Sequence, residues 1–351
     1  MSESTKCMTY KDAGVDIDAG SEATDRIKGL VQKTANRHVL SEVGQFGGLY
    51  DLAGIGEANP VLVSSIDSVG TKMKVAVEMG RFDTVGRDIV NHCTNDILVQ
   101  GARPIFFLDY IAVGIMAPDR MEDIVSGIAA ACIENDCVLI GGELCEMPEV
   151  YSSVDVDLVG SVVGLVDRSK ILDGSRVSDG DRLIGVASSG LHTNGYTLAR
   201  KALYGESPEK LHEVPEGLAR TLGEELLEPH RGYFKPLWPL LEEGSIHAMA
   251  HITGGGIPGN LSRIIPDDLT AEVNLRTWEP APIFQLLQGA TGAPTDELYR
   301  TFNMGVGMIL CVAPEEATGV IDHVRGFDIE ALEIGKVVDR GEGGSSPVVL
   351  V

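Results

Sequence analysis

The sequence predicts two α/β domains joined by a short polar linker, and three observations support this prediction. The chain has 351 residues, which is more than one typical domain and suggests two. Its first half alternates β-branched or aromatic runs with segments of helical periodicity. The polar, turn-rich segment 167–181 then precedes a second region that begins with another strand. We therefore expect domains at residues 1–166 and 182–351, with 167–181 as the linker.

Four strands and two helices are expected in the first half. Each strand is an apolar run bounded by Gly, Pro or Asp. The expected strands are Val61–Ile66, Ile105–Val113, Val138–Ile140 and Leu158–Val166. Asp83–Gln100 has one apolar stripe and ends before Gly101, so we expect a helix there, with Asn95 on its polar face and Asp96 at the boundary. The second helix is Asp119–Asp136, with an aspartate as its N-cap.

The second half repeats the alternation of strands and helices. A strand is expected at Arg182–Ala187, and further strands near Val306–Val312 and Val348–Val351. One helical pattern begins near Tyr196, and a second lies around Pro258–Ile265. No short-period repeat is visible, which argues against a solenoid or a propeller.

The charge balance excludes a nucleic-acid surface. The net charge is −24, with 52 acidic and 28 basic residues, and no basic stripe could displace counterions from phosphates. Two interpretations remain, a surface adapted to a salty cytoplasm and an acidic patch for a basic partner. At molar salt the Debye length is about 3 Å, so crowded carboxylates no longer repel one another. The acidic residues are spread along the chain, which favours the halophile interpretation.

No membrane span or export signal is expected, so we expect a cytoplasmic protein. The apolar runs are interrupted before the roughly 18 residues that a span needs, and the first residues lack an apolar core. The cysteines form no CxxC or zinc spacing and are expected to be reduced core residues. They are Cys7, Cys93, Cys132, Cys137, Cys145 and Cys311.

The most informative segment is Ser65-Ile-Asp-Ser-Val-Gly-Thr-Lys72, which directly follows an apolar run. It brings a carboxylate, a flexible turn, a hydroxyl and an ammonium to one strand end. A magnesium-bound polyphosphate requires these groups, although the spacing is not that of a P-loop. An ordinary strand–turn–helix junction is the alternative. The acidic elements Asn95-Asp96 and Gly141-Gly-Glu143 favour the metal interpretation.

Two loops of the second half are candidate anion sites. Ser188–Gly195 and His251–Gly256 each follow a strand, are rich in small or polar residues, and lead into a helix. Backbone N–H groups and the helix dipole favour negative charge at such a place. Each loop also contains a histidine, His192 or His251, although a single histidine is more often a structural hydrogen bonder than a catalyst.

Eight segments in one order closely resemble those of the phosphoribosylformylglycinamidine cyclo-ligase (AIR synthetase) family. The resemblance extends over nearly the whole chain from about Tyr10 onward. The first and last segments are specific to this enzyme, whereas Asn-Asp and Gly-Gly-Glu also occur in a wider superfamily of ATP-using enzymes. The segments are Lys11–Gly20, Asp67–Lys72, Asn95-Asp96, Phe106–Tyr110, Gly141–Pro148, Ser188–Gly195, His251–Gly256 and Arg300–Met308.

The resemblance implies a fold and a reaction. The N-terminal sheet would close an eight-stranded barrel across a homodimer, with the C-terminal α/β domain packed beside it and ATP in the cleft between the halves. The implied reaction is the ATP-dependent ring closure of formylglycinamidine ribonucleotide to aminoimidazole ribonucleotide in purine synthesis. ADP and phosphate would be released, Mg²⁺ would accompany ATP, and K⁺ is a further candidate ion.

The resemblance also implies roles for individual residues. Asp67 and Asp96 would be the leading magnesium ligands and Glu143 a weaker one, while Lys72 and either His192 or His251 would be catalytic. The residues expected along the nucleotide are Lys28, Gly44, Phe46, Gly47, Gly48, Asp67, Thr71, Lys72, Asn95, Asp96, Gly141, Gly142 and Glu143. Those expected to hold substrate or phosphate are Ser188, Ser189, Gly190, His192, Thr193, Asn194, Thr253, Gly254, Gly255, Gly256 and Asn303.

Some positions depart from the family pattern, and other functions stay open. Ser68 replaces a usual glycine, and Leu144-Cys145 replaces Thr-Ala, which puts any hydroxyl contact there in doubt. A sister ATP-using enzyme of the superfamily would use the same cleft: selenophosphate synthetase, thiamine-monophosphate kinase or the hydrogenase-maturation dehydratase. A non-enzymatic nucleotide-binding scaffold would need a broken metal site, yet Asp67, Asp96 and Lys72 are all present.

Overall fold

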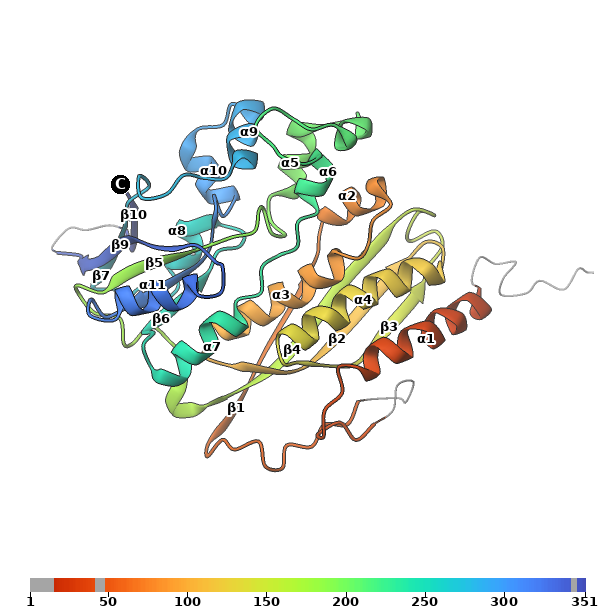
Figure 1. The fold of residues 1–351 in the computed structure, drawn as a ribbon, viewed down its shortest axis with the longest axis horizontal. Coiled ribbons are helices and arrows are strands. Elements are labelled where there is room, and N and C mark those ends of the chain that lie inside the picture. Colours follow the sequence, from red (N-terminus) through yellow and green to blue (C-terminus); the bar gives the residue numbers. More distant parts are fainter. Residues whose placement is uncertain (1–15, 42–47, 342–345) are drawn as a thin grey trace, which may run out of the picture.

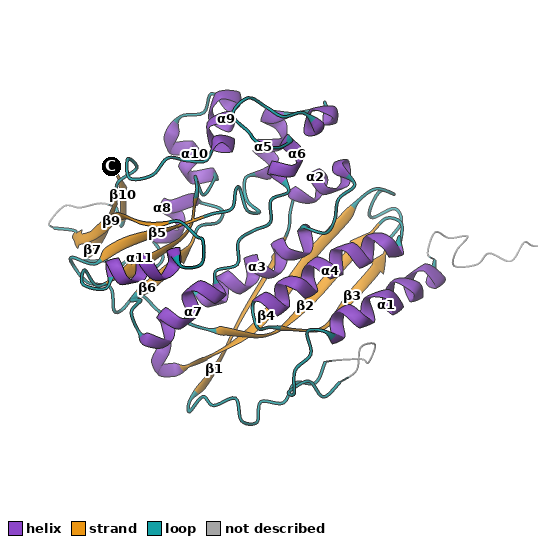
Figure 2. Cartoon of the chain, in the orientation of Figure 1, coloured by secondary structure: helices purple, strands orange, loops and turns teal. Residues whose placement is uncertain are grey.

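The computed structural model describes residues 16–41, 48–341 and 346–351, and it contains two sheets with helices packed against them (Figure 1). The first sheet has four strands in the order β1-β4-β2-β3, and the second has six in the order β10-β7-β9-β5-β8-β6. Figure 2 shows the two sheets at opposite ends of the molecule with helices between and around them. The expected two-part α/β architecture is confirmed.

The N-terminal sheet is mixed. β4 pairs antiparallel with both β1 and β2, and β2 pairs parallel with β3 at the sheet edge. The four predicted strands are all present, with somewhat wider bounds. They are β1 (Pro60–Ser68), β2 (Arg103–Val113), β3 (Val138–Glu146) and β4 (Val156–Asp167).

Among the described residues, the helices that contact this sheet lie on one of its faces (Figure 1). Alternate residues of a strand point to opposite faces, so Ser65 and Asp67 of β1 point toward α3, while Leu62 and Ile66 point to the open face. Leu62 and Ile66 are 60% and 70% exposed. The helices of this half are α1 (Ile17–Gln32), α2 (Lys72–Met79), α3 (Val85–Leu98) and α4 (Pro118–Glu134).

The C-terminal sheet is largely antiparallel, with β10 parallel to β7 at one edge. Its strands are β5 (Arg182–Ala187), β6 (Ala248–His251), β7 (Leu269–Val273), β8 (Val306–Val312), β9 (Ala331–Asp339) and β10 (Val348–Leu350). The helices and short 3₁₀ turns of this half are η1 (Arg168–Lys170), α5 (Tyr196–Leu203), η2 (Pro208–His212), α6 (Leu222–Leu226), α7 (Phe234–Glu243), α8 (Gly256–Leu261), α9 (Pro282–Thr291), α10 (Thr295–Thr301) and α11 (Ala317–Arg325). One apolar cluster runs through both halves, so they share a core.

Two sequence expectations about element ends are wrong. β3 does not stop at Ile140 but continues through the glycines to Glu146, because Gly142 pairs with Asp109 of β2 and leaves room for its carboxylate. Helix α4 is capped by Ala117, with Pro118 as its first residue and no aspartate cap. Among the described residues, none of the helices combines the length and the apolar character needed to cross a bilayer.

Candidate functional site

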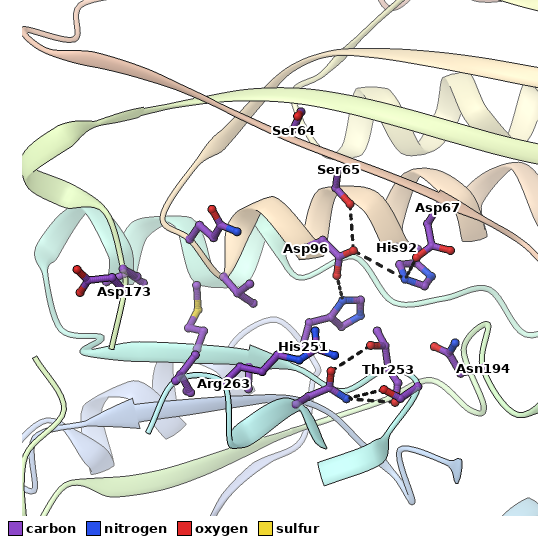
Figure 3. Close-up of a pocket in the computed structure, with 18 of the residues that line it drawn as sticks. Ser64, Ser65, Asp67, His92, Asp96, Asp173, Asn194, His251, Thr253 and Arg263 are labelled. Atoms are coloured by element: carbon purple, nitrogen blue, oxygen red, sulfur yellow. Dashed lines mark hydrogen bonds and ion pairs between the residues drawn. The ribbon is translucent and has the colours of Figure 1, made fainter. Parts of the chain in front are cut away.

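A cavity of about 720 Å³ lies between the two halves (Figure 3). The strand β1 and helix α3 form its N-terminal side, through Ser65, Asp67 and Asp96 among others. The end of β6, the loop before α8, the end of α8 with the residues after it, and the segment 171–173 form the C-terminal side. Residues from both domains therefore meet around one space, as a cleft-binding enzyme requires.

Two carboxylates, Asp67 and Asp96, line the cavity and are held by imidazoles (Figure 3). His92 Nε2 lies 2.9 Å from Asp67 Oδ2, and His251 Nδ1 lies 2.8 Å from Asp96 Oδ1. Ser65 Oγ donates to the other Asp96 oxygen at 3.1 Å. The side chain of Asp96, expected from the sequence at the boundary of the polar face of α3, lines the cavity.

Both carboxylates are favoured in the ionised form. Burial raises the pKa of Asp67, but the hydrogen bond and charge of His92 outweigh burial and hold the pKa below its ordinary value. Burial likewise raises the pKa of Asp96, and the hydrogen bond from His251 with the nearby imidazoles outweighs it. The cavity therefore presents two negative charges at neutral pH.

Four buried histidines gather behind these carboxylates: His92, His192, His230 and His251. Burial lowers the pKa of His192, His230 and His251. Burial also acts to lower the pKa of His92, but Asp67 and Asp96 outweigh it and raise the value above 6.5. The protonated form is therefore more favourable at His92 than at the other three imidazoles.

Of the two predicted proton carriers, only His251 reaches the cavity lining. His192 is buried and stacks on His230, with ring centroids 3.9 Å apart and planes inclined by 19°. Its backbone has a φ of 63°, and its Nε2 accepts from the Ser189 N–H. The structure thus places His192 as a packing residue of the cluster rather than a residue of the cavity wall.

Lys72 lies behind the cavity rather than along a nucleotide. Its ammonium donates to Asp88 Oδ1 at 2.8 Å and to the carbonyl oxygens of Glu228 at 2.7 Å and His192 at 3.2 Å. An ammonium has three donors, and these contacts use all of them. In this structure the side chain is fully buried and its hydrogen bonds are all made inside the protein, so the expected contact with ATP stays a prediction that the geometry does not favour.

Other predicted site residues are also engaged inside the protein. Asn95 donates to the carbonyl of Arg231 and accepts from the N–H of Tyr233, so it fastens the segment before α7. Asn303 donates to the carbonyl of Gly190 and accepts from Ser188. Neither amide lines the cavity, and both make structural hydrogen bonds, so the expected ligand contacts of these residues stay predictions.

The loop after β5 contributes one side chain to the cavity, Asn194. Ser188, Ser189 and Gly190 lie outside the lining, and Ser189 donates to the Pro229 carbonyl. Thr193 is buried and its hydroxyl contacts two histidines of the cluster. Of the residues in this loop that were expected to hold substrate or phosphate, Asn194 alone lines the cavity.

The loop after β6 contributes Thr253 and Gly254 to the lining. Asn260 fixes this loop, because its amide donates to the carbonyls of residues 253, 254 and 256. Gly255 and Gly256 have φ of 95° and 61° and lie behind the lining. Arg263 extends into the cavity (Figure 3) and is the one Lys or Arg among the described lining residues.

The Gly-Gly-Glu element lies far from the carboxylate pair. Gly142 and Asp67 occupy one row across the sheet, but β4 and β2 separate their strands, which corresponds to about 14 Å. The Glu143 side chain also contacts Cys145 on the open face, whereas Asp67 points to the helix-covered face. Within one chain, Glu143 is therefore not a third ligand beside Asp67 and Asp96, and Gly141 is likewise remote.

The remaining nucleotide-binding candidates do not line the cavity. Thr71 contacts the Thr197 hydroxyl at 2.9 Å. Lys28 pairs with Asp25 beside a second hollow of about 540 Å³, between α1 and the end of β3. Gly48 packs against Ile140 of β3. Gly44, Phe46 and Gly47 lie outside the described residues.

The donors at the cavity fit a magnesium ion. Mg²⁺ prefers carboxylate and water oxygens, and the ionised Asp67 and Asp96 side chains offer these with Ser64 and Ser65 nearby. His92, Asp96 and His251 also lie close enough together to bind a metal ion. Each imidazole nitrogen that faces a carboxylate is, however, already hydrogen-bonded to it. The residues that would hold Mg²⁺ are therefore the two aspartates.

Sequence reasoning missed several residues of the site, chiefly His92, His230 and Arg263. His92 precedes Asp96 by one helical turn, so the i, i+4 spacing on α3 was a usable signal. His230 lies in an irregular segment before α7, where no periodicity marks it. Arg263 follows α8 without a recognisable motif.

Comparisons with known proteins find matches to both halves of the chain. Residues 49–166 match the family of AIR synthase related proteins, N-terminal domain, and residues 178–346 match its C-terminal domain. The phosphoribosylformylglycinamidine cyclo-ligase of Geotalea uraniireducens is 46% identical over 351 residues, covering 100% of both chains.

Solved structures share the fold at low identity. The thiamine-monophosphate kinase of Stenotrophomonas maltophilia K279a has a TM-score of 0.69 at 18% identity, covering 94% of this chain and 95% of that one. The hydrogenase maturation protein HypE in complex with ATP has a TM-score of 0.64 at 18% identity, covering 93% and 90%. At such identity these two show the fold alone, whereas the full-length match identifies the family: the chain belongs to the phosphoribosylformylglycinamidine cyclo-ligases.

Proposed function

We propose that this protein closes the imidazole ring of aminoimidazole ribonucleotide from formylglycinamidine ribonucleotide, using ATP and releasing ADP and phosphate. The observation that carries the proposal is the match to a cyclo-ligase over all 351 residues. The cavity between the domains, with its two ionised carboxylates, also supports the proposed function.

The chemistry needs activation of a poor leaving group. A formamide oxygen does not leave by itself, so the γ-phosphoryl group of ATP is transferred to it, ADP leaves, and the oxygen becomes part of a phosphate leaving group. The amidine nitrogen then attacks the activated carbon, loses a proton, and phosphate departs with the former formyl oxygen. Because little covalent chemistry falls to the protein, its work is positioning and charge neutralisation.

We assign the metal-facing role to Asp67 and Asp96. Mg²⁺ held there would neutralise part of the phosphate charge. Arg263, on the C-terminal side of the cavity, is the one Lys or Arg among the described lining residues and is opposite in charge to these two aspartates. We place an anionic part of a substrate near Arg263, with Asn194 and Thr253 as hydrogen-bonding neighbours.

The proton lost by the amidine nitrogen needs an acceptor at the cavity. The Asp96 carboxylate is the best candidate, because it is ionised and held in place by His251 and Ser65. His251 supports it rather than acting alone, since both of its ring nitrogens are already engaged. His192 has no route to the substrate in this arrangement.

We also propose that two protomers associate through the open face of the N-terminal sheet. Leu62, Ile66 and Leu108 expose apolar side chains on that face, and the described helices that contact the sheet lie on the opposite one. Exposed apolar side chains on one face of a sheet are a common site of association. A second copy would cover this face by the same residues, as a twofold interface requires.

ADP release by the purified protein tests the proposed function. We expect ADP and phosphate only when formylglycinamidine ribonucleotide is added with Mg²⁺ and ATP. ADP release stimulated instead by thiamine monophosphate or selenide would assign the chain to a sister reaction. Substrate-independent ADP release would contradict the proposal.

A further inference from the structure

The cavity contains a cation that the protein itself does not neutralise. Arg263 is the one Lys or Arg among the described lining residues, whereas Asp67, Asp96 and Asp173 all contribute carboxylates. The Arg263 side chain is exposed and makes no hydrogen bond or ion pair with any residue that the structure describes. In a chain with 52 acidic and 28 basic residues, an arginine without a carboxylate partner is available to bind an anion from outside.

The nearby acidic residue of the linker, Asp173, does not take up this cation. Its Oδ1 accepts from the N–H of Ser175 at 3.0 Å, and its carboxylate forms no ion pair with Arg263. Figure 3 shows Asp173 at one side of the view and Asp67 at the other, with Arg263 between Asp173 and Thr253. The guanidinium therefore stays free on the C-terminal wall.

The backbone around Arg263 is fixed although its side chain is free. Gly174 of the linker packs against the residue after Arg263, since a Cβ at Gly174 would lie 2.5 Å from the carbonyl oxygen of Ile264. The linker is fastened in turn to the end of α3, because the N–H of Leu172 donates to the carbonyl of Gln100 at 3.2 Å. Arg263 therefore extends from a wall that both domains and the linker build together.

The cavity is elongated along helix α3. Its lining on this side begins at His92 and Asp96 and continues to Val99 and Gln100, which corresponds to about 12 Å along the helix axis. The carboxylate of Asp67 lies at the His92 end, 2.9 Å from that imidazole. A ligand that fills this space therefore extends from the two carboxylates toward the linker.

Two kinds of phosphate take part in the proposed reaction, and they differ in their counter-charge. The phosphates of ATP are accompanied by Mg²⁺, which binds carboxylates and phosphate oxygens together, so they are expected at Asp67 and Asp96. The phosphate monoester of the ribonucleotide has a charge of about −1.5 to −2 at pH 7 and no metal of its own. Ionised carboxylates repel it, whereas a guanidinium can bind it through two parallel hydrogen bonds.

We propose that Arg263 binds the phosphate monoester of the ribonucleotide substrate, while the phosphates of ATP stay with the metal at Asp67 and Asp96. Arg263 is then a specificity-determining residue, because it favours an acceptor that has a terminal phosphate over the same acceptor without one. The identity of this acceptor rests on the proposed function, whereas binding of a phosphate monoester by Arg263 rests on the cavity alone.

The first test measures binding without ATP or turnover. Ribose 5-phosphate is titrated calorimetrically into the protein in EDTA, so that no metal can hold the phosphate at the aspartates. We expect saturable binding to the wild type and binding at least about 10-fold weaker to Arg263→Met. Arg276→Met is the matched control, because Arg276 is an exposed arginine of the same domain outside the cavity lining, and it should bind as the wild type does.

Two results of this titration would overturn the proposal. One is equal affinity of the wild type and Arg263→Met for ribose 5-phosphate, and the other is no binding to the wild type. Unphosphorylated ribose should not displace the bound ribose 5-phosphate. Displacement by ribose at equal concentration would also contradict a site that recognises the phosphate.

The second test compares formylglycinamidine ribonucleotide with the corresponding ribonucleoside, which lacks the phosphate. Arg263→Met should lower kcat/KM for the ribonucleotide about 10- to 100-fold and leave both the value for the ribonucleoside and the KM for ATP near those of the wild type. Arg263→Lys should lie between the two, because it keeps the charge and loses the two-pronged geometry.

The kinetic comparison also separates this proposal from its alternatives. A raised KM for ATP with an unchanged KM for the ribonucleotide would show that ATP meets Arg263, and the proposal would be wrong. Equal losses with the ribonucleotide and the ribonucleoside would show a structural role and overturn it as well. If the protein does not convert formylglycinamidine ribonucleotide at all, the proposed function fails, and the titration with ribose 5-phosphate still decides the role of Arg263.

Discussion

Asp67 and Lys72 lie five residues apart in one strand–turn–helix segment, yet they meet opposite environments. Asp67 faces the cavity between the domains and is ionised. Lys72 is fully buried, and its ammonium is consumed by Asp88 and two carbonyl oxygens. The neighbours Asn95 and Asp96 divide in the same way, one fastening α7 and the other lining the cavity.

These two pairs show that one short segment can both line the cavity and join the two domains. One side chain of each pair meets the substrate space, and the other ties the N-terminal domain to the loops of the C-terminal domain. Burial and saturated hydrogen bonds, rather than residue type, separate the two groups. Substitutions should therefore affect turnover in the first group and stability in the second.

Asp96→Asn should show the largest effect on turnover. It removes the negative charge that faces the substrate and weakens the bond from His251, so we expect kcat to fall about 10²- to 10⁴-fold. Asp173→Asn is a matched control, because Asp173 lines the same cavity outside the imidazole network. Steady-state rates of aminoimidazole ribonucleotide formation measure both. Equal losses in the two variants would contradict the special position of Asp96.

Lys72→Met should instead lower stability. Removing one partner of a buried pair leaves the Asp88 charge uncompensated, so we expect the free energy of unfolding to fall by about 3–5 kcal/mol. Lys74→Met is the control, since Lys74 pairs with Asp155 at the surface and should cost less than about 1 kcal/mol. Denaturant unfolding of the two variants compares them. A stable Lys72→Met protein that lacks turnover would restore the catalytic assignment.

The sequence predicted the secondary structure better than the environment of each site residue. The strands Arg182–Ala187 and Val306–Val312 have the predicted bounds, because each is a buried run between clear breakers. Asp67 and Asp96 were found since each lies on a strongly patterned element. The burial of Lys72 could not be predicted from the sequence, because its partners His192 and Glu228 are 120 and 156 residues away. Periodicity reports local structure and carries no such long-range pairing.

The raised pKa of His92 predicts a smaller, pH-dependent effect. Its pKa is raised above 6.5 in the folded protein, so its contribution to stability is complete below pH 6.5 and is lost as the pH rises through the folded value. Asp67 is partly exposed and solvent screens the pair, so we expect about 1 kcal/mol. Thermal unfolding of wild type and His92→Gln between pH 6 and 9 tests this. Parallel pH profiles would show that His92 is not the titrating group.

The acidic surface predicts the mildest and broadest effect, a dependence on salt. A net charge of −24 per chain repels itself when the Debye length is about 30 Å, near 0.01 M salt, and much less at 1 M. We propose adaptation to high salt, so the thermal midpoint should rise from dilute to molar potassium chloride. A flat or falling midpoint would favour a local acidic docking patch instead.

The fate of the formyl oxygen tests the central claim most directly. Formylglycinamidine ribonucleotide labelled with ¹⁸O in its formyl group is converted with unlabelled ATP, and the released phosphate is analysed by mass spectrometry. If ATP activates the formamide oxygen, each phosphate carries one ¹⁸O atom. Unlabelled phosphate, formed together with ADP and aminoimidazole ribonucleotide, would contradict the account.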